Sequence, residues 1–352
     1  MNRRLLVDLE ALAANYRLFA RAADGGATGS VVKADAYGTG AATSAARLVA
    51  EGCRSFFVAS PEEGLALRRG LGPGPEIFVF EGVDADDAPA LAGAGIIPVL
   101  NHPGQLESWR PFAASPAAVH VDTGMSRLGF PADGIDDVDF SGFNLTLLMT
   151  HLACADEPEH ALNDVQLRRF DVVKRHFPGI RTSVGNSAGC LSSAARRGDL
   201  GRPGIGLYGG NPFVTRANPC RPVAALQGRV LQIKALDAGA SVGYGATRTL
   251  SERTPVAVVG IGYADGVSRY LSGRGEFFLA GRRCPILGRV SMDLTVVDVS
   301  GAPGAAVGDW AECFGANIGI DEVAASVGTI PYTLLTGVGA RVPRVFEPLE
   351  PG

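Results

Sequence analysis

The amino-acid sequence predicts an α/β plus β fold class: an N-terminal (β/α)8, TIM-like barrel followed by a C-terminal domain rich in β-strands. Two observations carry this prediction. Up to Gly210, short apolar runs rich in β-branched residues alternate with helical patterns at a spacing of roughly 20 to 35 residues, which is typical of βαβ units in a parallel sheet. After Gly210, strand-like runs follow one another with turn residues between them, and helical patterns are few.

Eight apolar runs in the first part of the chain are candidate strands. They occupy residues 30–33, 55–59, 76–80, 96–100, 118–122, 145–149 and 180–184, and a weaker run covers 201–207. Between them, residues 41–52 and 61–70 have apolar residues three and four apart, and residues 161–177 give the clearest helical pattern. Eight strand–helix units favour a closed barrel over an open sheet.

The change in character near Gly210 sets the expected domain boundary. Residues 211–222 hold three prolines and are expected to form a linker. The barrel is therefore expected to span residues 9–222, and the β-rich domain residues 223–352. The N-terminal strand at 1–8 is expected to join the second domain.

Composition and charge exclude several classes of protein. The formal net charge of −4 provides no basic surface for nucleic acid or an anionic membrane. Asp8 and Glu10 interrupt the first apolar run too early for a signal peptide, and no run reaches membrane-spanning length. The six cysteines are scattered without a C-x-x-C pair, so neither a disulfide framework nor a metal site is expected. A reducing, cytoplasmic location is expected.

Polar residues follow several candidate strands at their carboxyl ends, where barrel enzymes build their active sites. They are Lys33 at the first strand, Asp122 at the fifth, His151 after the sixth, Asn186 and Ser187 after the seventh, and Arg202 at the eighth. A lysine held there is a candidate Schiff-base former, because burial or a nearby cation frees its amine as a nucleophile. The glycine-rich turn at 202–206 offers backbone N–H groups to a phosphate. An aldolase-type enzyme would use a lysine at the same place, so these residues alone leave the reaction open.

Ordered motifs along nearly the whole chain make it resemble the alanine racemase family of pyridoxal-phosphate enzymes. The motifs are VVKADAYG at 31–38, HVDTGMSRLGF at 120–130, MTHLACAD at 149–156, RPGIGLYGG at 202–210, VGYGAT at 242–247, GIGYADGVSR at 260–269, GRVSMD at 288–293 and RVPRVF at 341–346. The resemblance implies that pyridoxal 5'-phosphate is attached to Lys33. It also implies a homodimer with shared active sites that racemises alanine and supplies D-alanine for peptidoglycan.

The resemblance also implies a role for each matching residue. Lys33 would be the base on one face of the substrate Cα, and Tyr244 of the second subunit the base on the other. The cofactor would be bound by Lys33, Tyr37, Arg127, His151, Asn186, Ser187, Arg202, Gly204 and Ile205. Arg127 and Met292 would meet the substrate carboxylate, while Tyr263, Arg269, Arg289 and Asp293 would line the approach. Asp122 is expected only to hold the DTG turn.

Three positions depart from the family pattern. His120 stands where many members have a carbamylated lysine, and a neutral histidine nitrogen is a weaker partner for Arg127 than a carbamate anion. Ser183 stands where a histidine is common, and Ala340 replaces a tyrosine that narrows the pocket. A broader serine/alanine racemase is therefore the first alternative to an alanine racemase.

Two further alternatives belong to other functional classes. A non-catalytic pyridoxal-phosphate carrier would share the barrel and the lysine, but such chains are typically a lone barrel without the β-rich domain. A related amino-acid decarboxylase would carry a cysteine-bearing motif in the second domain, and the GRVSMD segment lacks one. Racemisation of alanine remains the preferred prediction.

Overall fold

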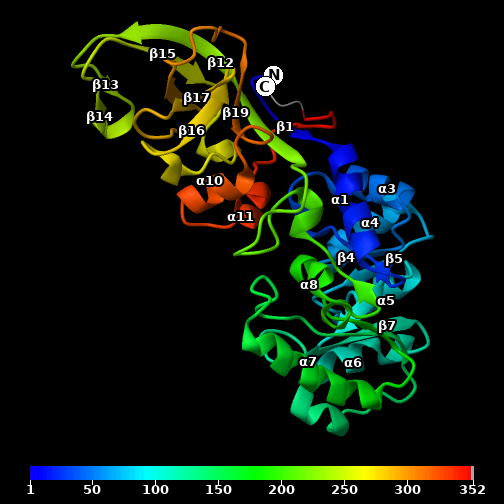
Figure 1. The fold of residues 1–352 in the computed structure, drawn as a ribbon. Coiled ribbons are helices and arrows are strands. Elements are labelled where there is room, and N and C mark those ends of the chain that lie inside the picture. Colours follow the sequence, from blue (N-terminus) through cyan, green and yellow to red (C-terminus); the bar gives the residue numbers. More distant parts are fainter. Residues whose placement is uncertain (350–352) are drawn as a thin grey trace. The chain divides into compact units, whose positions relative to one another are not determined.

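The computed structural model describes residues 1–349 and divides into two compact units (Figure 1). The barrel unit comprises residues 13–207 and 211–220, and the β unit comprises residues 1–12, 208–210 and those from 221 onward. The segment predicted as a linker thus lies largely in the barrel unit, where the Val214 amide donates to the Asp156 carbonyl over 3.2 Å. None of the helices within residues 1–349 combines the length and apolar character needed to cross a membrane.

Seven strands form the main sheet of the barrel unit, and each pairs in parallel with its neighbours. In sheet order they are β10 (Arg181–Ser183), β9 (Asn144–Met149), β7 (Pro116–Asp122), β6 (Ile97–Leu100), β5 (Glu76–Val79), β4 (Ser55–Val58) and β3 (Ser30–Val31), with β8 (Phe130–Pro131) added beside β7. All four residues of β4 are buried. Burial on both faces explains why these strands appear in the sequence as continuous apolar runs instead of alternating patterns.

The eighth strand is shorter than predicted and closes the barrel. It is β11 (Leu200–Gly201), which pairs in parallel with β2 (Ala27–Thr28), and the remainder of the predicted 201–207 strand forms a loop and the 3-10 helix η4 (Ile205–Tyr208). The Arg202 amide donates to the Gly185 carbonyl over 2.9 Å, and the Gly29 amide donates to the Gly201 carbonyl over 2.9 Å. These bonds link the last strand to both the seventh and the first.

Helices follow the strands of the barrel unit in the alternation that the sequence predicts. They are α1 (Leu9–Ala22), α2 (Lys33–Tyr37), α3 (Ala41–Ala50), α4 (Pro61–Leu71), α5 (Ala88–Gly93), α6 (Pro103–Trp109), η1 (Arg110–Phe112), η2 (Ala132–Asp137), α7 (Ala161–Val173), η3 (Lys174–His176), α8 (Ser187–Ser192) and α9 (Ala194–Arg197). The helix predicted at 161–177 is α7, with its last turn tightened into η3.

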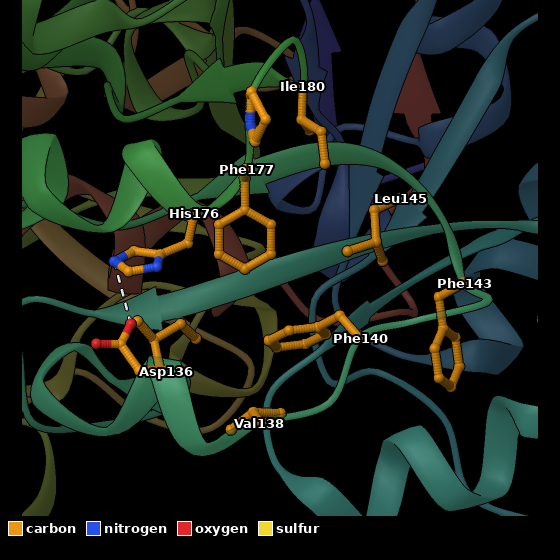
Figure 2. A pocket seen from close by; sticks show the side chains of 10 residues that line it. Asp136, Val138, Phe140, Phe143, Leu145, His176, Phe177 and Ile180 are labelled. Carbon is orange, nitrogen blue, oxygen red and sulfur yellow. Dashed lines mark ion pairs between the residues drawn. The ribbon is translucent and has the colours of Figure 1, made fainter.

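A surface depression of about 420 Å³ lies at the amino ends of β9 and β10, shown in Figure 2. Phe140 and Phe177 meet edge to face across it, with ring centroids 5.3 Å apart, and His176 pairs with Asp136 over 3.0 Å at its border. This depression lies at the opposite strand ends from Lys33 and His151.

The β unit is built around a long central strand, β12 (Ala224–Leu236). This strand pairs antiparallel with β1 (Arg3–Val7), β15 (Thr254–Val259) and β19 (Trp310–Phe314), and β1 also pairs in parallel with β20 (Arg344–Val345). The other elements are β13 (Ser241–Val242), η5 (Tyr244–Ala246), β14 (Arg248–Thr249), η6 (Tyr263–Asp265), η7 (Arg269–Leu271), β16 (Glu276–Leu279), β17 (Arg282–Pro285), β18 (Thr295–Asp298), α10 (Ile320–Ser326) and α11 (Pro331–Thr336). The predicted predominance of strands after residue 223 is confirmed.

Candidate active site

A cavity of about 190 Å³ lies at the carboxyl ends of the barrel strands. Its walls combine basic side chains with apolar ones: Lys33, Arg127, His120 and His151, together with Ala59, Phe80, Glu81, Leu128 and Met149. These residues follow or end several different strands and meet at one rim, as the (β/α)8 arrangement predicts. Glu81 is the one acidic residue in this lining. The cavity is therefore suited to an anionic ligand.

Lys33 is half-buried, and its amine lies 5.9 Å from the centre of the Phe80 ring. Burial and the nearby Arg127 guanidinium lower the pKa of Lys33 below its ordinary value, while Glu63 and Glu81 act in the opposite direction. A lowered pKa increases the fraction of neutral amine, which is the form that attacks a carbonyl or accepts a proton.

Residues 33–37 form a short helical turn that is left-handed from Ala34 onward. Ala34, Asp35, Ala36 and Tyr37 all have φ between 51° and 55°, so four consecutive non-glycine residues are in the left-handed helical region. Each such residue costs about 1–2 kcal/mol relative to a right-handed helix. Hydrogen bonds from the Gly38 amide to the Ala34 carbonyl, 2.8 Å, and from the Thr39 hydroxyl to the Ala36 carbonyl, 2.6 Å, stabilise the turn. Backbone strain of this kind is concentrated at functional sites.

The turn brings Tyr37 to the glycine-rich loop at 202–206. A Cβ atom on Gly204 would lie only 2.3 Å from the Tyr37 hydroxyl, so the close approach requires glycine. The Ser187 hydroxyl accepts hydrogen bonds from the Gly204 amide, 2.9 Å, and the Gly206 amide, 3.2 Å. Tyr37, Ser187 and the loop carrying Ile205 are all buried together. The Ser187 hydroxyl, which these two amides hold in place, and the Tyr37 hydroxyl are donors from which a phosphate could accept.

Asn186 and Asp122 have local roles in the structure. The Asn186 side chain is the N-cap of α8, where its oxygen accepts from the Gly189 amide over 3.1 Å. Asp122 accepts from the amides of Gly124, Met125 and Ser126 over 2.9, 2.9 and 3.1 Å, so it holds the DTG turn as predicted. That turn delivers the exposed Arg127 to the cavity.

Arg202 is buried behind the cavity and is bound by neutral groups. Its guanidinium donates to the Ser183 hydroxyl over 2.5 Å and to the Thr150 carbonyl over 2.7 Å, and it lies 3.5 Å from Nδ1 of His151. Burial lowers the pKa of Arg202 to about 10, which still leaves it protonated at neutral pH. Burial, followed by the positive charge of Arg202 and other basic neighbours, holds the pKa of His151 well below its usual value. Arg202 therefore provides a fixed cation beside a neutral imidazole.

His120 is buried with its tautomer fixed by a neighbour. Its Nδ1 lies 2.9 Å from the side-chain oxygen of Asn101, whose own NH₂ donates to the carbonyls of Val99, 2.7 Å, and Phe80, 3.0 Å. Because the Asn101 amide is oriented by two carbonyls, its oxygen faces His120 and Nδ1 carries the hydrogen. Burial, with Arg202 nearby, lowers the pKa of His120 to about 4. The neutral ring keeps Nε2 as an acceptor, as the sequence-based interpretation requires.

In the β unit, Tyr244 begins the exposed 3-10 turn η5, and 72% of the residue is accessible. Gly243 and Gly245 flank it with φ of 72° and 74°, a backbone conformation that favours glycine. A Cβ atom on Gly245 would lie 2.9 Å from Nη1 of Arg289, so the Arg289 guanidinium lies directly beside this turn. The pairing places a cation next to the loop that presents the Tyr244 phenol.

The segment 288–293 connects this turn to the other predicted residues of the β unit. The Tyr263 amide donates to the Ser291 carbonyl and the Ala264 amide to the Met292 carbonyl, both over 3.0 Å. A Cβ atom on Gly262 would come within 2.3 Å of the Ser291 carbonyl oxygen, which explains the glycine there. Three motifs that are distant in sequence, 242–247, 260–269 and 288–293, thus meet on one part of the β unit.

The remaining predicted residues lie around these motifs. Asp293 pairs with Arg341 over 2.5 Å, and Arg341 also binds the buried Asp265 over 2.7 Å. Tyr263 and Arg269 border a surface depression of about 530 Å³ next to α11. Ala340 is exposed and follows Gly339, whose amide donates to the Asp265 carbonyl over 3.4 Å.

Three residues that support the site were not identified from the sequence. Asn101 fixes the tautomer of His120, Thr150 accepts from Arg202, and Glu63 binds the turn after Lys33. Glu63 had a partial signal, because Ser60 followed by Glu three residues later is a capping pattern. Asn101 and Thr150 follow the fourth and sixth predicted strands, so their place at strand ends was the available signal.

Comparisons with known proteins agree with this architecture. The family models described as the alanine racemase N-terminal and C-terminal domains match residues 7–212 and 223–346. An alanine racemase from Rhodospirillum rubrum is 43% identical over 99% of this chain and 96% of its own, and one from Acidiphilium cryptum is 43% identical over 97% and 98%. The crystal structure of alanine racemase from Bartonella henselae with covalently bound pyridoxal phosphate has a TM-score of 0.93 and 34% identity, covering 99% of this chain and 100% of that one. The chain belongs to the alanine racemase family.

Proposed function

We propose that the protein interconverts L-alanine and D-alanine by a two-base mechanism that uses pyridoxal 5'-phosphate bound in the barrel cavity. The observation that carries this proposal is the environment of Lys33: a half-buried amine at the barrel rim, surrounded by Arg127, His151 and His120. The cytoplasm is the proposed location, and supply of D-alanine for peptidoglycan is the proposed role.

The barrel residues fit this cofactor. Pyridoxal phosphate has a carbonyl, a phosphate and a pyridine nitrogen, and when bound it acidifies the Cα–H bond of an attached amino acid. Lys33 offers the amine for the carbonyl. Tyr37, Ser187 and the loop at Gly204 and Ile205 offer hydroxyls and backbone to the phosphate. Arg202 would meet the ring nitrogen as a donor and keep it unprotonated, because a guanidinium has no acceptor and stays charged.

Lys33 is distinguished from the other lysines of the chain. The sequence has three lysines. Lys174 pairs with Asp171 over 2.6 Å, and Lys234 is exposed on β12. Lys33 alone among the three lines the cavity at the barrel rim. It is therefore the residue suited to hold the cofactor and to act as a base.

Racemisation needs one base on each face of the substrate Cα. Nζ of Lys33 would remove or return the proton on one face, and Oη of Tyr244 would return or remove it on the other. A phenol acts as a base only where cations stabilise its anion. Arg289 beside the Tyr244 turn, Arg127 in the cavity and Arg202 buried behind it can supply that charge. We propose that Tyr244 is provided by the second subunit of a homodimer, so that two sites are each shared between chains.

The substrate carboxylate would be bound by Arg127 and by the backbone of Met292. Tyr263, Arg269, Arg289 and Asp293 would line the approach. Alanine is the proposed substrate. Because Ala340 adds little bulk, serine is the second candidate, and a panel of amino acids tests the two together.

The decisive experiment maps the cofactor and the products on the same preparation. Borohydride reduction after loading with pyridoxal phosphate should fix the cofactor on the peptide that contains Lys33. Lys33→Ala should lose the protein-bound visible band and lower kcat by more than about a thousandfold, since both the attachment point and a base are removed. Lys174→Ala and Lys234→Ala are the matched controls and should keep both the protein-bound visible band and the wild-type kcat. Labelling at either control position would refute the proposal. Incubation with L-alanine that yields no D-alanine would refute it as well.

A further inference from the structure

Glu63 lies in the first turn of α4, yet its carboxylate binds outside that helix. One oxygen accepts from the Ala34 amide over 2.7 Å, and the other accepts from the Ala59 amide over 2.8 Å. Ser60 is the N-cap and Glu63 occupies the third helical position, where a glutamate usually reaches back to the N-cap amide. Here the Glu63 carboxylate instead bonds to the amide of Ala59, directly after β4, and to the amide of Ala34, the residue after Lys33.

The residue that Glu63 binds is the first of the left-handed turn. Ala34 has φ of 51° and ψ of 50°, and the next three residues follow the same conformation. The later part of the turn is held by its own backbone bonds, from the Ala36 amide to Val32 and from the Gly38 amide to Ala34. The Ala34 amide donates to the Glu63 carboxylate instead. A charge-assisted bond at this point opposes the backbone strain where it begins.

We propose that Glu63 is a positioning residue for the active site, holding the left-handed turn so that the Lys33 amine and the Tyr37 hydroxyl keep fixed positions relative to the end of β4. The turn is the direct link between the two groups, because Lys33 begins it and Tyr37 ends it. The inference rests on the proposed function, since it explains how the amine is kept in place for the cofactor.

Stability of α4 alone does not account for the contacts of Glu63. The helix already has the Ser60 hydroxyl as its cap, which accepts from the Glu63 amide over 3.4 Å, and Pro61 at its first position. Glu62 supplies a second acidic residue in the same turn and is exposed. The charge of Glu63 also raises the pKa of Lys33 against the effects of burial and Arg127. Glu63 therefore acts on the lysine through its charge as well as through the backbone.

Three full-length variants test this role: Glu63→Ala, Glu63→Gln and the matched control Glu62→Ala. Glu63→Ala should raise the Kd for pyridoxal phosphate about tenfold and lower kcat at least as much, with a smaller change in KM for alanine, because a charge-assisted bond at the turn is lost. Glu63→Gln keeps one acceptor oxygen and should fall between Glu63→Ala and wild type. Glu62→Ala should match wild type.

A second readout does not depend on the loaded enzyme. After cofactor removal with hydroxylamine, the pH profile of Lys33 acylation by trace acetic anhydride measures the amine directly. Both Glu63 variants should move the midpoint to lower pH, since a carboxylate that favours the ammonium is gone, while Glu62→Ala should not. Melting temperatures of all three variants should stay within a few degrees of wild type, which excludes general unfolding as the cause.

The possible outcomes separate the two proposals. If Glu63→Ala binds the cofactor as wild type does, or if its acylation midpoint equals that of Glu62→Ala, the positioning role is refuted. A melting temperature that falls together with cofactor affinity in Glu63→Gln would equally refute it in favour of a purely structural role. If wild-type protein takes up no pyridoxal phosphate, the proposed function fails, and the acylation profile still reports on Glu63.

Discussion

The two units hold their predicted site residues in opposite ways. In the barrel unit, Arg202 is 2% exposed and His120 8% exposed, and hydrogen bonds fix each of them. In the β unit, Tyr244 is 72% exposed and Met292 51% exposed, and both are presented by turns. The barrel cavity is arranged within its own unit, whereas the proposed role of the exposed Tyr244 would require another surface to enclose it. Enclosure matters because charge interactions strengthen when water is excluded.

The largest effect is expected when two inactive variants are mixed, an experiment that tests whether the other surface belongs to a second copy of the chain. Lys33→Ala and Tyr244→Ala should each be inactive. When they are mixed through unfolding and refolding, random pairing makes about half the dimers mixed, and each mixed dimer has one site with both residues intact. About a quarter of wild-type activity should therefore return.

Refolding each variant alone is the control and should restore nothing. Mixed dimers should be demonstrated independently, by a size or affinity tag on one chain. If they are present and no activity returns, the shared site is refuted, and His151 in the barrel becomes the first candidate for the second base.

The next effect concerns burial in the barrel unit and depends on pH. His120 has an unfolded pKa of 6.5 and a folded pKa of about 4, so the unfolded chain binds a proton first as the pH falls. Stability is therefore full above pH 6.5 and decreases toward pH 4, by at most about 3 kcal/mol from this group. His120→Asn keeps a donor for Asn101 and removes the titration, so its unfolding free energy should depend less steeply on pH across this range.

Urea unfolding at several pH values measures this slope. His102→Asn, at an exposed position next to α6, is the matched control substitution. His151 titrates in the same direction in both proteins, so the comparison isolates His120. Equal slopes in wild type and His120→Asn would show that His120 is not buried as a neutral ring.

A smaller effect is expected at Ser183, where a histidine is common in the family. Its hydroxyl accepts from Arg202 and donates to the Leu200 carbonyl, so it links a buried cation to the last barrel strand. Ser183→Ala should lower the free energy of unfolding by about 1–3 kcal/mol, because a buried charged donor loses a partner. Ser108→Ala, which removes an exposed hydroxyl on α6, should change it by less than about 0.5 kcal/mol. A loss at Ser183 no larger than at Ser108 would contradict this account.

The barrel was predictable because its strands are buried on both faces and so form continuous apolar runs. The same reasoning overestimated the eighth strand, since Gly204 and Gly206 in the 201–207 run serve a loop that Ser187 binds. Alternation of strands and helices gives the order of elements, but it does not reveal where a glycine-rich run leaves the sheet. Hydrogen bonds to a side chain from another element decide that point.

The contents of the site were predictable to different degrees. Lys33 at a strand end was indicated by its chemistry, whereas Tyr244 was indicated only by the resemblance of its motif. The left-handed turn had no signal, because Ala34, Ala36 and Tyr37 are not residues that favour positive φ as glycine does. The reach of Glu63 to Ala34 is a tertiary contact that local patterns do not contain.

The smallest expected effect is at Ala340, on the exposed side of the comparison. Ala340 is accessible, and the residue before it, Gly339, lies against the 263–265 turn of the β unit. A Cβ atom added to Gly339 would lie 2.5 Å from the Ala264 carbonyl oxygen. A tyrosine placed here can extend without displacing buried atoms, so Ala340→Tyr should leave stability unchanged.

If alanine at this position widens the substrate pocket, the variant should prefer alanine over serine more strongly than wild type does. If the new hydroxyl reaches the cofactor phosphate, cofactor binding should tighten by about 1 kcal/mol or less. Ala325→Tyr, at an exposed position on α10, is the matched control and should change neither quantity. Ratios of kcat/KM for L-alanine and L-serine measure the preference, and an unchanged ratio in Ala340→Tyr would mean that another residue sets the width of the pocket.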